Sequence, residues 1–221
     1  MVPLFWYSGT WGTMQWKERG IVMAAEYLSI YPVFQNVAEF DRVVIEEERY
    51  PNHKWEFDGE DIRDLGALNF AGGANEHADI SSNIIVAMTI AIRAKNLKCR
   101  VGTSDKWLKL ANARLLPDVM VNCTPQEKKA IGITDPSIIF EVISDGTEKY
   151  DLSIKKNLYE MIPLLHAYVV VATNEQQVRV FVKTAEGKFS SGTTYVAGDT
   201  ITFTAPSVDM TVDDIYFGIP A

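Results

Sequence analysis

The chain has 221 residues, 47% of them hydrophobic, and its 21 basic and 29 acidic side chains give a formal net charge of −8. This charge counts against a broad nucleic-acid-binding surface, although it leaves room for a local one. No apolar run is long enough to span a bilayer, so we expect a cytoplasmic protein without membrane contact. The length fits a single domain, which we place at residues 23–221, and residues 1–22, which match no periodic pattern, are expected to form an N-terminal arm.

The first half of the domain predicts a long amphipathic helix and a hairpin. A short helix is expected at residues 23–34 and a strand at residues 41–45. Asp58-Gly59 is a turn signal that predicts a hairpin over residues 53–62, in which Glu56 would face solvent. Helical spacing of apolar residues predicts a helix from Asp79 to Asn96, whose apolar face packs on a sheet; these residues are Ile80, Ile84, Ile85, Met88 and Ile92.

The second half is rich in short apolar runs that predict strands. These runs lie at residues 98–103, 107–110, 115–121, 138–143, 167–172, 178–183, 188–191, 201–203 and 208–212. A helix carrying Lys155 and Lys156 is expected at residues 151–161, and Pro163 ends it. This order predicts an α/β fold, with a mixed sheet and helices on its faces.

The two cysteines, Cys99 and Cys123, have no spacing typical of a zinc site. Each lies among residues typical of a strand. We therefore expect both to be small buried hydrophobic residues.

Two of the predicted strands carry one carboxylate each. Asp118 precedes Val119-Met120-Val121, and Glu141 lies inside the run at residues 138–143. An ionised carboxylate in such a place is costly unless it is paired, and a bound cation is one way to hold two of them. Together with the lysine helix they make the set of groups used by a metal-dependent phosphodiesterase. Each acid alone is more often structural, as a strand-entry residue or as the partner of a basic side chain.

The segments LPDVMV, FEVISDGTEKYD, KKNLY and IPLLHAYVVV together resemble the Uma-two-type restriction endonuclease family, within the PD-(D/E)xK nuclease superfamily. The resemblance covers residues 23–183 and implies a restriction-endonuclease-like mixed sheet flanked by helices. Pro117-Asp118 and Glu141 match the superfamily motif, but Ile143 stands where that motif has lysine. The resemblance implies that the lysine comes from the following helix, at Lys155, with Lys156 as the fallback.

The resemblance also implies the cofactor and the partner. Asp118, Glu141, the carbonyl of Val142 and an upstream acid, Glu56, would bind Mg²⁺, with Mn²⁺ as second choice. Lys155 would orient the attacking water or stabilise the developing charge. Nucleic acid, most readily DNA, is the implied substrate, and a homodimer is expected because cutting a duplex takes two sites.

Two further side chains are candidates for accessory roles near the acids. His77, at the start of the long predicted helix, could meet a phosphate, the acidic site or a loop carbonyl. Tyr159 lies one turn after Lys155 and would support it or pack in the core.

Two other functions remain open from the sequence. One is a catalytically silent binding or scaffold protein with a nuclease fold, which the net charge and the displaced lysine favour. The other is a glycoside hydrolase that uses Asp118 and Glu141 as its carboxyl pair. Dependence on a divalent ion would separate the nuclease from the hydrolase.

Overall fold

The computed structural model of the chain describes residues 32–49, 54–65, 74–127 and 130–220. Contacts divide the chain into two units, Met1–Val33 and Phe34–Ala221, and the fold described is that of the second unit. The predicted arm and most of the helix expected at residues 23–34 lie outside the described residues. The boundary expected between residues 22 and 23 therefore stays a prediction.

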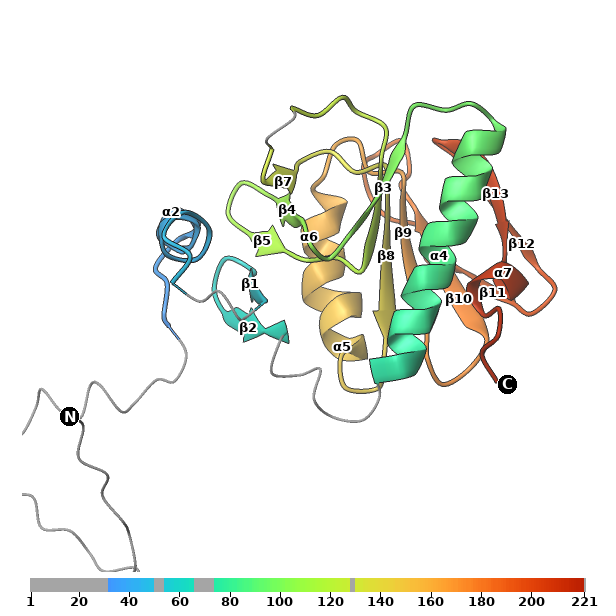
Figure 1. Ribbon diagram of the computed structural model, residues 1–221, viewed down its shortest axis with the longest axis horizontal. Helices are drawn as coiled ribbons and strands as arrows, with labels where there is room; N and C mark the ends of the chain where they lie inside the picture. The colour runs from blue at the N-terminus through green and yellow to red at the C-terminus, as the bar shows by residue number, and fades with distance from the viewer. Residues whose placement is uncertain (1–31, 50–53, 66–73, 128–129, 221) are drawn as a thin grey trace, which may run out of the picture. The chain divides into compact units, whose positions relative to one another are not determined.

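A six-stranded mixed sheet forms the centre of the fold (Figure 1). Strands β8 and β9 are parallel, and every other neighbouring pair in this sheet is antiparallel. This mixed sheet with helices against it confirms the predicted α/β, restriction-endonuclease-like fold. In spatial order the strands are β11 (Thr193–Val196), β10 (Gln177–Val182), β9 (Ala167–Ala172), β8 (Ile138–Ile143), β6 (Val119–Asn122) and β3 (Arg100–Thr103).

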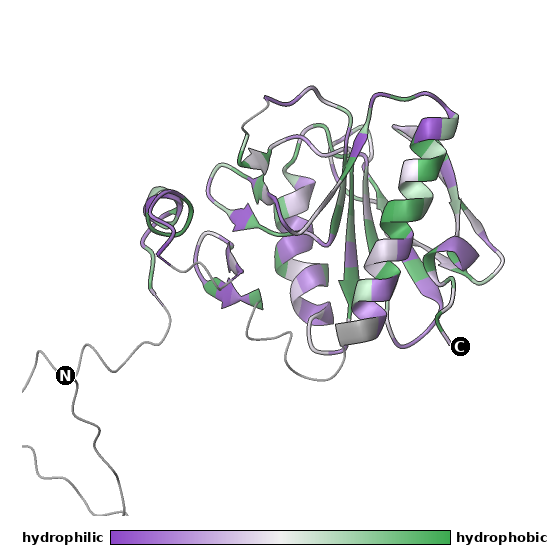
Figure 2. Cartoon of the chain, viewed as in Figure 1, coloured by the Kyte–Doolittle hydropathy of each residue, from purple (hydrophilic) through white to green (hydrophobic). Residues whose placement is uncertain are grey.

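The sheet separates two hydrophobic clusters because successive side chains of a strand point to opposite faces. On one face lies α4 (Ala74–Ala94), whose predicted apolar residues pack against the sheet in a cluster that includes Phe140. On the other face, Tyr159 from the lysine helix packs with Ile139 and Tyr168. The strands between them are accordingly apolar along most of their length (Figure 2). The first cluster also includes residues of β12 (Thr200–Thr204), β13 (Ser207–Thr211) and α7 (Val212–Ile215).

The lysine helix is one helical segment in three parts. It consists of α5 (Glu148–Tyr150), a π-helical turn η2 (Asp151–Lys155) and α6 (Lys156–Glu160). The observed segment therefore begins three residues before the predicted start at Asp151. Its π-helical turn is not visible in the sequence pattern, because it needs only one residue more than an α-turn.

A second sheet has five short strands, which alternate along the chain with the first strands of the central sheet. Its order is β2 (Ile62–Asp64), β1 (Trp55–Phe57), β5 (Arg114–Leu115), β4 (Trp107–Lys109) and β7 (Gly132–Ile133). Strands β1 and β2 form the antiparallel hairpin predicted around Asp58-Gly59. The chain before it forms α2 (Val37–Phe40) and the π-helix η1 (Asp41–Glu46).

The strand predicted at residues 41–45 is wrong, since these residues belong to η1. Val43 and Val44 are strand formers, but in helical form they bury against an aromatic cluster that includes Phe40. The Arg114 guanidinium also donates to both carboxylate oxygens of Asp41, at 2.8 and 2.7 Å. Packing and this ion pair outweigh the local strand preference.

Other boundaries differ from the predictions in smaller ways. Helix α4 begins at Ala74 rather than Asp79, and the strand expected at residues 115–121 is interrupted at Pro117-Asp118, giving β5 and β6. The run at residues 188–191 forms only an isolated bridge between Lys183 and Phe189. Among the described residues, no helix is long and apolar enough to cross a membrane.

Cys99 and Cys123 form a disulfide. The antiparallel pairing of β3 with β6 ends at Arg100 opposite Asn122, so one further step places the two cysteines opposite each other. Both are half-buried against the first cluster. The prediction that both cysteines are small buried hydrophobic residues is therefore wrong, because cysteine spacing does not report which distant strands pair.

Candidate active site

Asp118 and Glu141 come together because of the register between β6 and β8. Val119 pairs with Phe140, so one further step of the same antiparallel register places Asp118 opposite Glu141. The Asp118 carboxylate accepts a hydrogen bond of 2.8 Å from the backbone N–H of Val142, which holds it against β8. Residues directly opposite in antiparallel strands point to the same face, so both carboxylates are directed to one side of the sheet.

Lys155 lies among the buried carboxylates. Its side chain is 7% exposed, and its Nζ lies 3.0 Å from Glu141 Oε1, 3.2 Å from Glu56 Oε1 and 3.5 Å from Asp151 Oδ1. One ammonium is therefore shared by three acids, an arrangement that neutralises only part of their charge.

The π-helical turn determines where Lys155 lies. The backbone N–H of Lys156 bonds to the carbonyl of Asp151, five residues earlier, which is the π-helical pattern. Lys156 turns away from the acids, and its ammonium lies 4.3 Å from the centroid of the Phe181 ring. Neighbouring lysines on a helix point about 100° apart, and here only Lys155 reaches the acids.

Glu56 is only 1% exposed, so the expectation that it faces solvent is wrong, and its side chain lies with the other acids of the cleft. Its Oε1 accepts a hydrogen bond of 2.7 Å from the backbone N–H of Leu116 and also contacts Lys155. Its Oε2 is buried and has no hydrogen-bond partner among the described residues. A buried acceptor without a donor is costly, and it leaves one oxygen free for a ligand.

His77 and Tyr159 each contact one of the two strand acids. His77, in the first turn of α4, has its Nε2 3.1 Å from Asp118 Oδ2. Tyr159 is fully buried, and its hydroxyl donates to Glu141 Oε1 at 2.6 Å. Tyr159 thus supports the acid beside Lys155, while His77 meets the acidic site rather than a loop carbonyl.

Asp151 is a further acid of the group, and it is not among the site residues predicted from the sequence. It is 4% exposed and contacts Lys155 four residues later in the same helix. Its spacing to Lys155 was the available signal, since residues four apart on a helix are neighbours.

The electrostatics of the group are dominated by burial and by this crowding. Burial, opposed by Lys155 but reinforced by Asp118 and other acids, raises the pKa of Glu141 well above its usual range. Burial also raises the pKa of Asp118, but the hydrogen bond and charge of His77 outweigh it, so the net shift is downward. The pKa of Lys155 is raised despite its burial, because Glu141 and Glu56 lead the carboxylates around it.

The acids, Lys155 and His77 line a cleft of about 640 Å³, together with Val142, Arg63 and Tyr150. Carboxylate oxygens suit a hard divalent cation, and the unpartnered Oε2 of Glu56 is a free acceptor at this place. Among the residues that the structure describes, no three acidic, histidine or cysteine side chains are gathered to ligate an ion. The donor chemistry thus fits such a cation, while the acids Glu56, Glu141 and Asp151 are here gathered around the Lys155 ammonium.

The sequence profile of the Uma2 family, described as "Putative restriction endonuclease", matches residues 37–212, most of the chain. The chain belongs to the Uma2 family. This confirms the resemblance seen in the sequence motifs, and the match includes Glu56, His77 and the segment from Asp118 to Tyr159.

Similar proteins are known by sequence and by structure. "Uncharacterized protein slr1290" of Synechocystis sp. is 29% identical over 177 residues, which cover 79% of this chain and 88% of that protein. "Uncharacterized protein sll1609" of the same organism is 24% identical over 107 residues, 47% of this chain and 60% of that one. The crystal structure of a "putative nuclease belonging to DUF820" from Anabaena variabilis matches with a TM-score of 0.62 at 13% identity, covering 82% of this chain and 97% of that chain. This last likeness shows the fold alone.

Proposed function

We propose that this protein is a metal-dependent endonuclease that hydrolyses phosphodiester bonds of nucleic acid, with DNA as the expected substrate. The observation that carries the proposal is the pair Asp118 and Glu141, opposite each other at the register of two antiparallel strands, with the Lys155 ammonium 3.0 Å from Glu141. Membership of the Uma2 family supports it.

Asp118, Glu141, Glu56 and the carbonyl of Val142 are the groups that would hold Mg²⁺ or Mn²⁺. When bound, such an ion polarises a phosphate oxygen and makes water a better nucleophile. His77 holds the Asp118 carboxylate in place from α4, and Tyr159 holds Glu141 through its hydroxyl. Both contacts hold the carboxylates in fixed orientations, and such orientation is what a metal-ligand site requires.

Lys155 supplies the positive charge that Ile143 cannot supply from β8. With a raised pKa it stays protonated at neutral pH, so it can donate to the attacking water or to a phosphate oxygen. The lowered pKa of Asp118 keeps that carboxylate ionised and able to bind a cation.

A catalytically silent nuclease-fold protein that binds nucleic acid is the second candidate. One observation favours it: among the described residues the acids are gathered around Lys155 rather than arranged as a ligand group for an ion. A homodimer and a cytoplasmic location remain predictions.

The deciding experiment is cleavage of supercoiled plasmid by the purified protein with Mg²⁺, with Mn²⁺ and with a chelator. We expect cleavage with either ion, none with the chelator, and none with Asp118→Ala. Single-stranded DNA and RNA substrates in parallel would identify the preferred nucleic acid. If the protein binds these substrates but cleaves none of them with either Mg²⁺ or Mn²⁺, the endonuclease proposal is wrong and the silent binding protein takes its place.

A further inference from the structure

The basic groups that line the cleft differ in whether they have an acidic partner. The described residues that line it include five carboxyl groups but only three strongly basic side chains, Lys54, Arg63 and Lys155. Lys155 is surrounded by acids, and Lys54 pairs with Asp105 at 3.1 Å. Arg63 has no ion pair among the described residues, and its buried Nε has no hydrogen-bond partner there.

The position of Arg63 is set by the β1–β2 hairpin and by an aromatic ring. Arg63 pairs with Glu56 across the hairpin, so both side chains project from the same face of it. The central carbon of the guanidinium lies 3.4 Å from the centroid of the Tyr150 ring. The Tyr150 hydroxyl donates a hydrogen bond of 3.1 Å to Asp58, a residue of the turn between β1 and β2. This bond fixes the position of the ring relative to the hairpin.

The guanidinium lies over the face of this ring, and among the described residues its buried Nε has no hydrogen-bond partner. An arginine stacked on a ring uses its face, whereas its N–H donors lie in the plane and point outward. A half-buried arginine with unused donors, in a cleft that otherwise carries an excess of acids, suits an anionic ligand. The planar fork of donors matches two oxygens of a phosphate group.

We propose that Arg63, placed over the ring of Tyr150, binds a backbone phosphate of the nucleic-acid strand next to the bond that is cut. This inference rests on the proposed function for the identity of the ligand. Arg63 would offset part of the repulsion between an anionic strand and the acids, and it would set which phosphate lies beside Asp118 and Glu141. It is a substrate-binding residue that the sequence motifs of the site do not include.

The test compares Arg63→Gln with Arg179→Gln, a matched control. Arg179 is also stacked on a ring, 4.8 Å from the centroid of Phe181, but it is exposed and lines a different hollow. Both changes remove one charge from an arginine over an aromatic ring. Binding of a fluorescein-labelled duplex oligonucleotide is followed by anisotropy over a series of salt concentrations, in chelator and with Mg²⁺ before product forms.

We expect Arg63→Gln to weaken binding about ten-fold, the loss typical of one charged hydrogen-bonding contact, and to reduce the salt slope by about one unit. Arg179→Gln should bind as the wild type does. Arg63→Lys should fall between them, because it keeps the charge but loses the fork. Thermal unfolding of each variant checks that the loss of binding is not a loss of folding.

The outcomes separate this inference from the endonuclease proposal. Equal binding by Arg63→Gln and Arg179→Gln, with wild-type cleavage intact, would overturn the role of Arg63 and leave the nuclease standing. If Arg63→Gln binds more weakly but the wild-type protein never cleaves, the phosphate-binding role of Arg63 stands and the proposed nuclease activity is wrong. A wild-type protein that binds no oligonucleotide under either condition would overturn both.

Discussion

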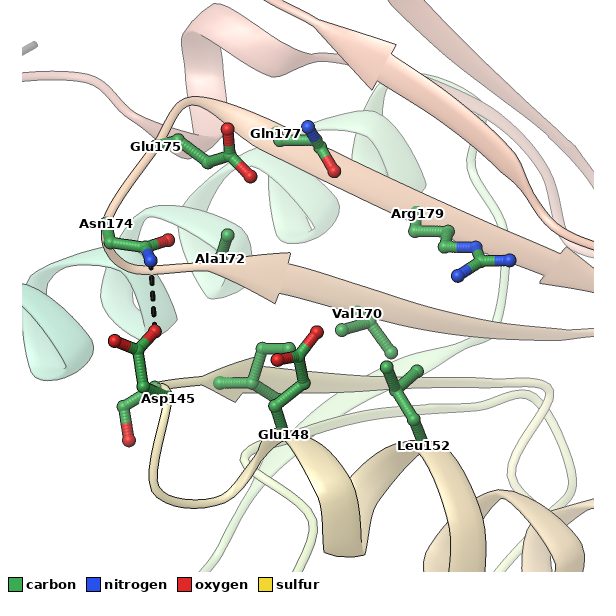
Figure 3. Close-up of a pocket in the computed structure, with 11 residues that line it drawn as sticks. Asp145, Glu148, Leu152, Val170, Ala172, Asn174, Glu175, Gln177 and Arg179 are labelled. Atoms are coloured by element: carbon green, nitrogen blue, oxygen red, sulfur yellow. Dashed lines mark hydrogen bonds between the residues drawn. The ribbon is translucent and has the colours of Figure 1, made fainter.

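Two hollows in this protein are lined by several acids, and they differ in how those acids are held. In the cleft, Glu56, Glu141 and Asp151 are at most 4% exposed and share the ammonium of Lys155. The second hollow, of about 190 Å³, has Asp145, Glu148 and Glu175 around it (Figure 3). Those three acids are exposed, and Asp145 accepts from the Asn174 side chain at 3.0 Å.

The difference shows why an accumulation of acids is not by itself a site. Exposed carboxylates are solvated and screened, so they cost little and need no partner. Arg179 lines the second hollow, but its guanidinium donates to the backbone carbonyl of Ser191 and lies over the ring of Phe181. Buried carboxylates are costly and persist only where something compensates them. Paired substitutions in the two hollows can therefore test whether the cleft alone has a function.

The largest effect is expected for the loss of one cleft acid. Asp118→Asn should reduce plasmid cleavage by about a thousand-fold or more, because several kcal/mol of transition-state stabilisation depend on a bound ion. Asp145→Asn, in the second hollow, should leave the rate within about two-fold, since surface changes away from a site have small effects. Equal losses in the two variants would remove the distinction between the hollows.

The next effect concerns the basic residue in each region. Lys155→Ala should abolish cleavage and lower the free energy of unfolding by about 3–5 kcal/mol, because it leaves buried acids without their partner. Arg179→Ala should cost less than about 1 kcal/mol. Urea unfolding measures both values.

Lys156→Ala is the control for position along the helix. It removes a neighbouring ammonium that lies on Phe181 rather than among the acids, so cleavage should be retained. Lys155→Ala should still bind metal, which titration calorimetry with Mn²⁺ would detect. Retained cleavage in Lys155→Ala with loss in Lys156→Ala would move the catalytic role to Lys156, and full activity in both would exclude a helix lysine.

A smaller effect is expected from divalent ions on stability. An ion that binds the folded cleft at about a hundred times its Kd should stabilise it by about 2.7 kcal/mol, or roughly 5–10 °C in Tm. Glu141→Gln should remove most of that rise, while Glu148→Gln should keep it. The same rise in all three proteins would place the ion elsewhere.

The smallest effect is a pH dependence of stability. The pKa of Glu141 is raised above 4.5, so the folded protein holds a proton that the unfolded chain releases. This contribution is complete below about pH 4.5 and is lost as pH rises through the raised folded pKa, by at most about 1.4 kcal/mol per pH unit. Urea unfolding at stepped pH should therefore show a decline that Glu141→Gln flattens. An unchanged decline in that variant would assign it to another group, such as Asp151, whose pKa burial also raises.

Much of the fold was predictable from local patterns. The run at residues 138–143 and the run at residues 167–172 are buried on both faces, so their continuous apolar character directly reports β8 and β9. The apolar stripe from Ile80 to Ile92 likewise reports the buried face of α4. The π-helix at Asp41–Glu46 and the Cys99–Cys123 bond depend on contacts between distant segments, which local patterns do not contain.

The candidate site was predictable to a lesser degree. The motif segments pointed to Asp118, Glu141 and Lys155, and the structure brings these three together. The burial of Glu56 was not predictable, because a three-residue strand in a hairpin has no pattern that tells which face will be covered. Arg63 was not predicted because its place in the cleft depends on Tyr150, which lies 87 residues later in the chain.

The π-helical turn at Asp151–Lys155 makes the site sensitive to helix length rather than to composition alone. An α-helix in its place would close with one residue fewer, and each residue removed turns the rest by about 100° around the axis. Deleting Ile154, which is 43% exposed, would therefore rotate Asp151 and α5 out of phase with Lys155 and Tyr159. Since α5 ends at Tyr150, the ring of that tyrosine would also leave its place beside Lys155. A homologue that has lost this one residue can thus keep every acid and lysine of the cleft and still be unable to assemble it.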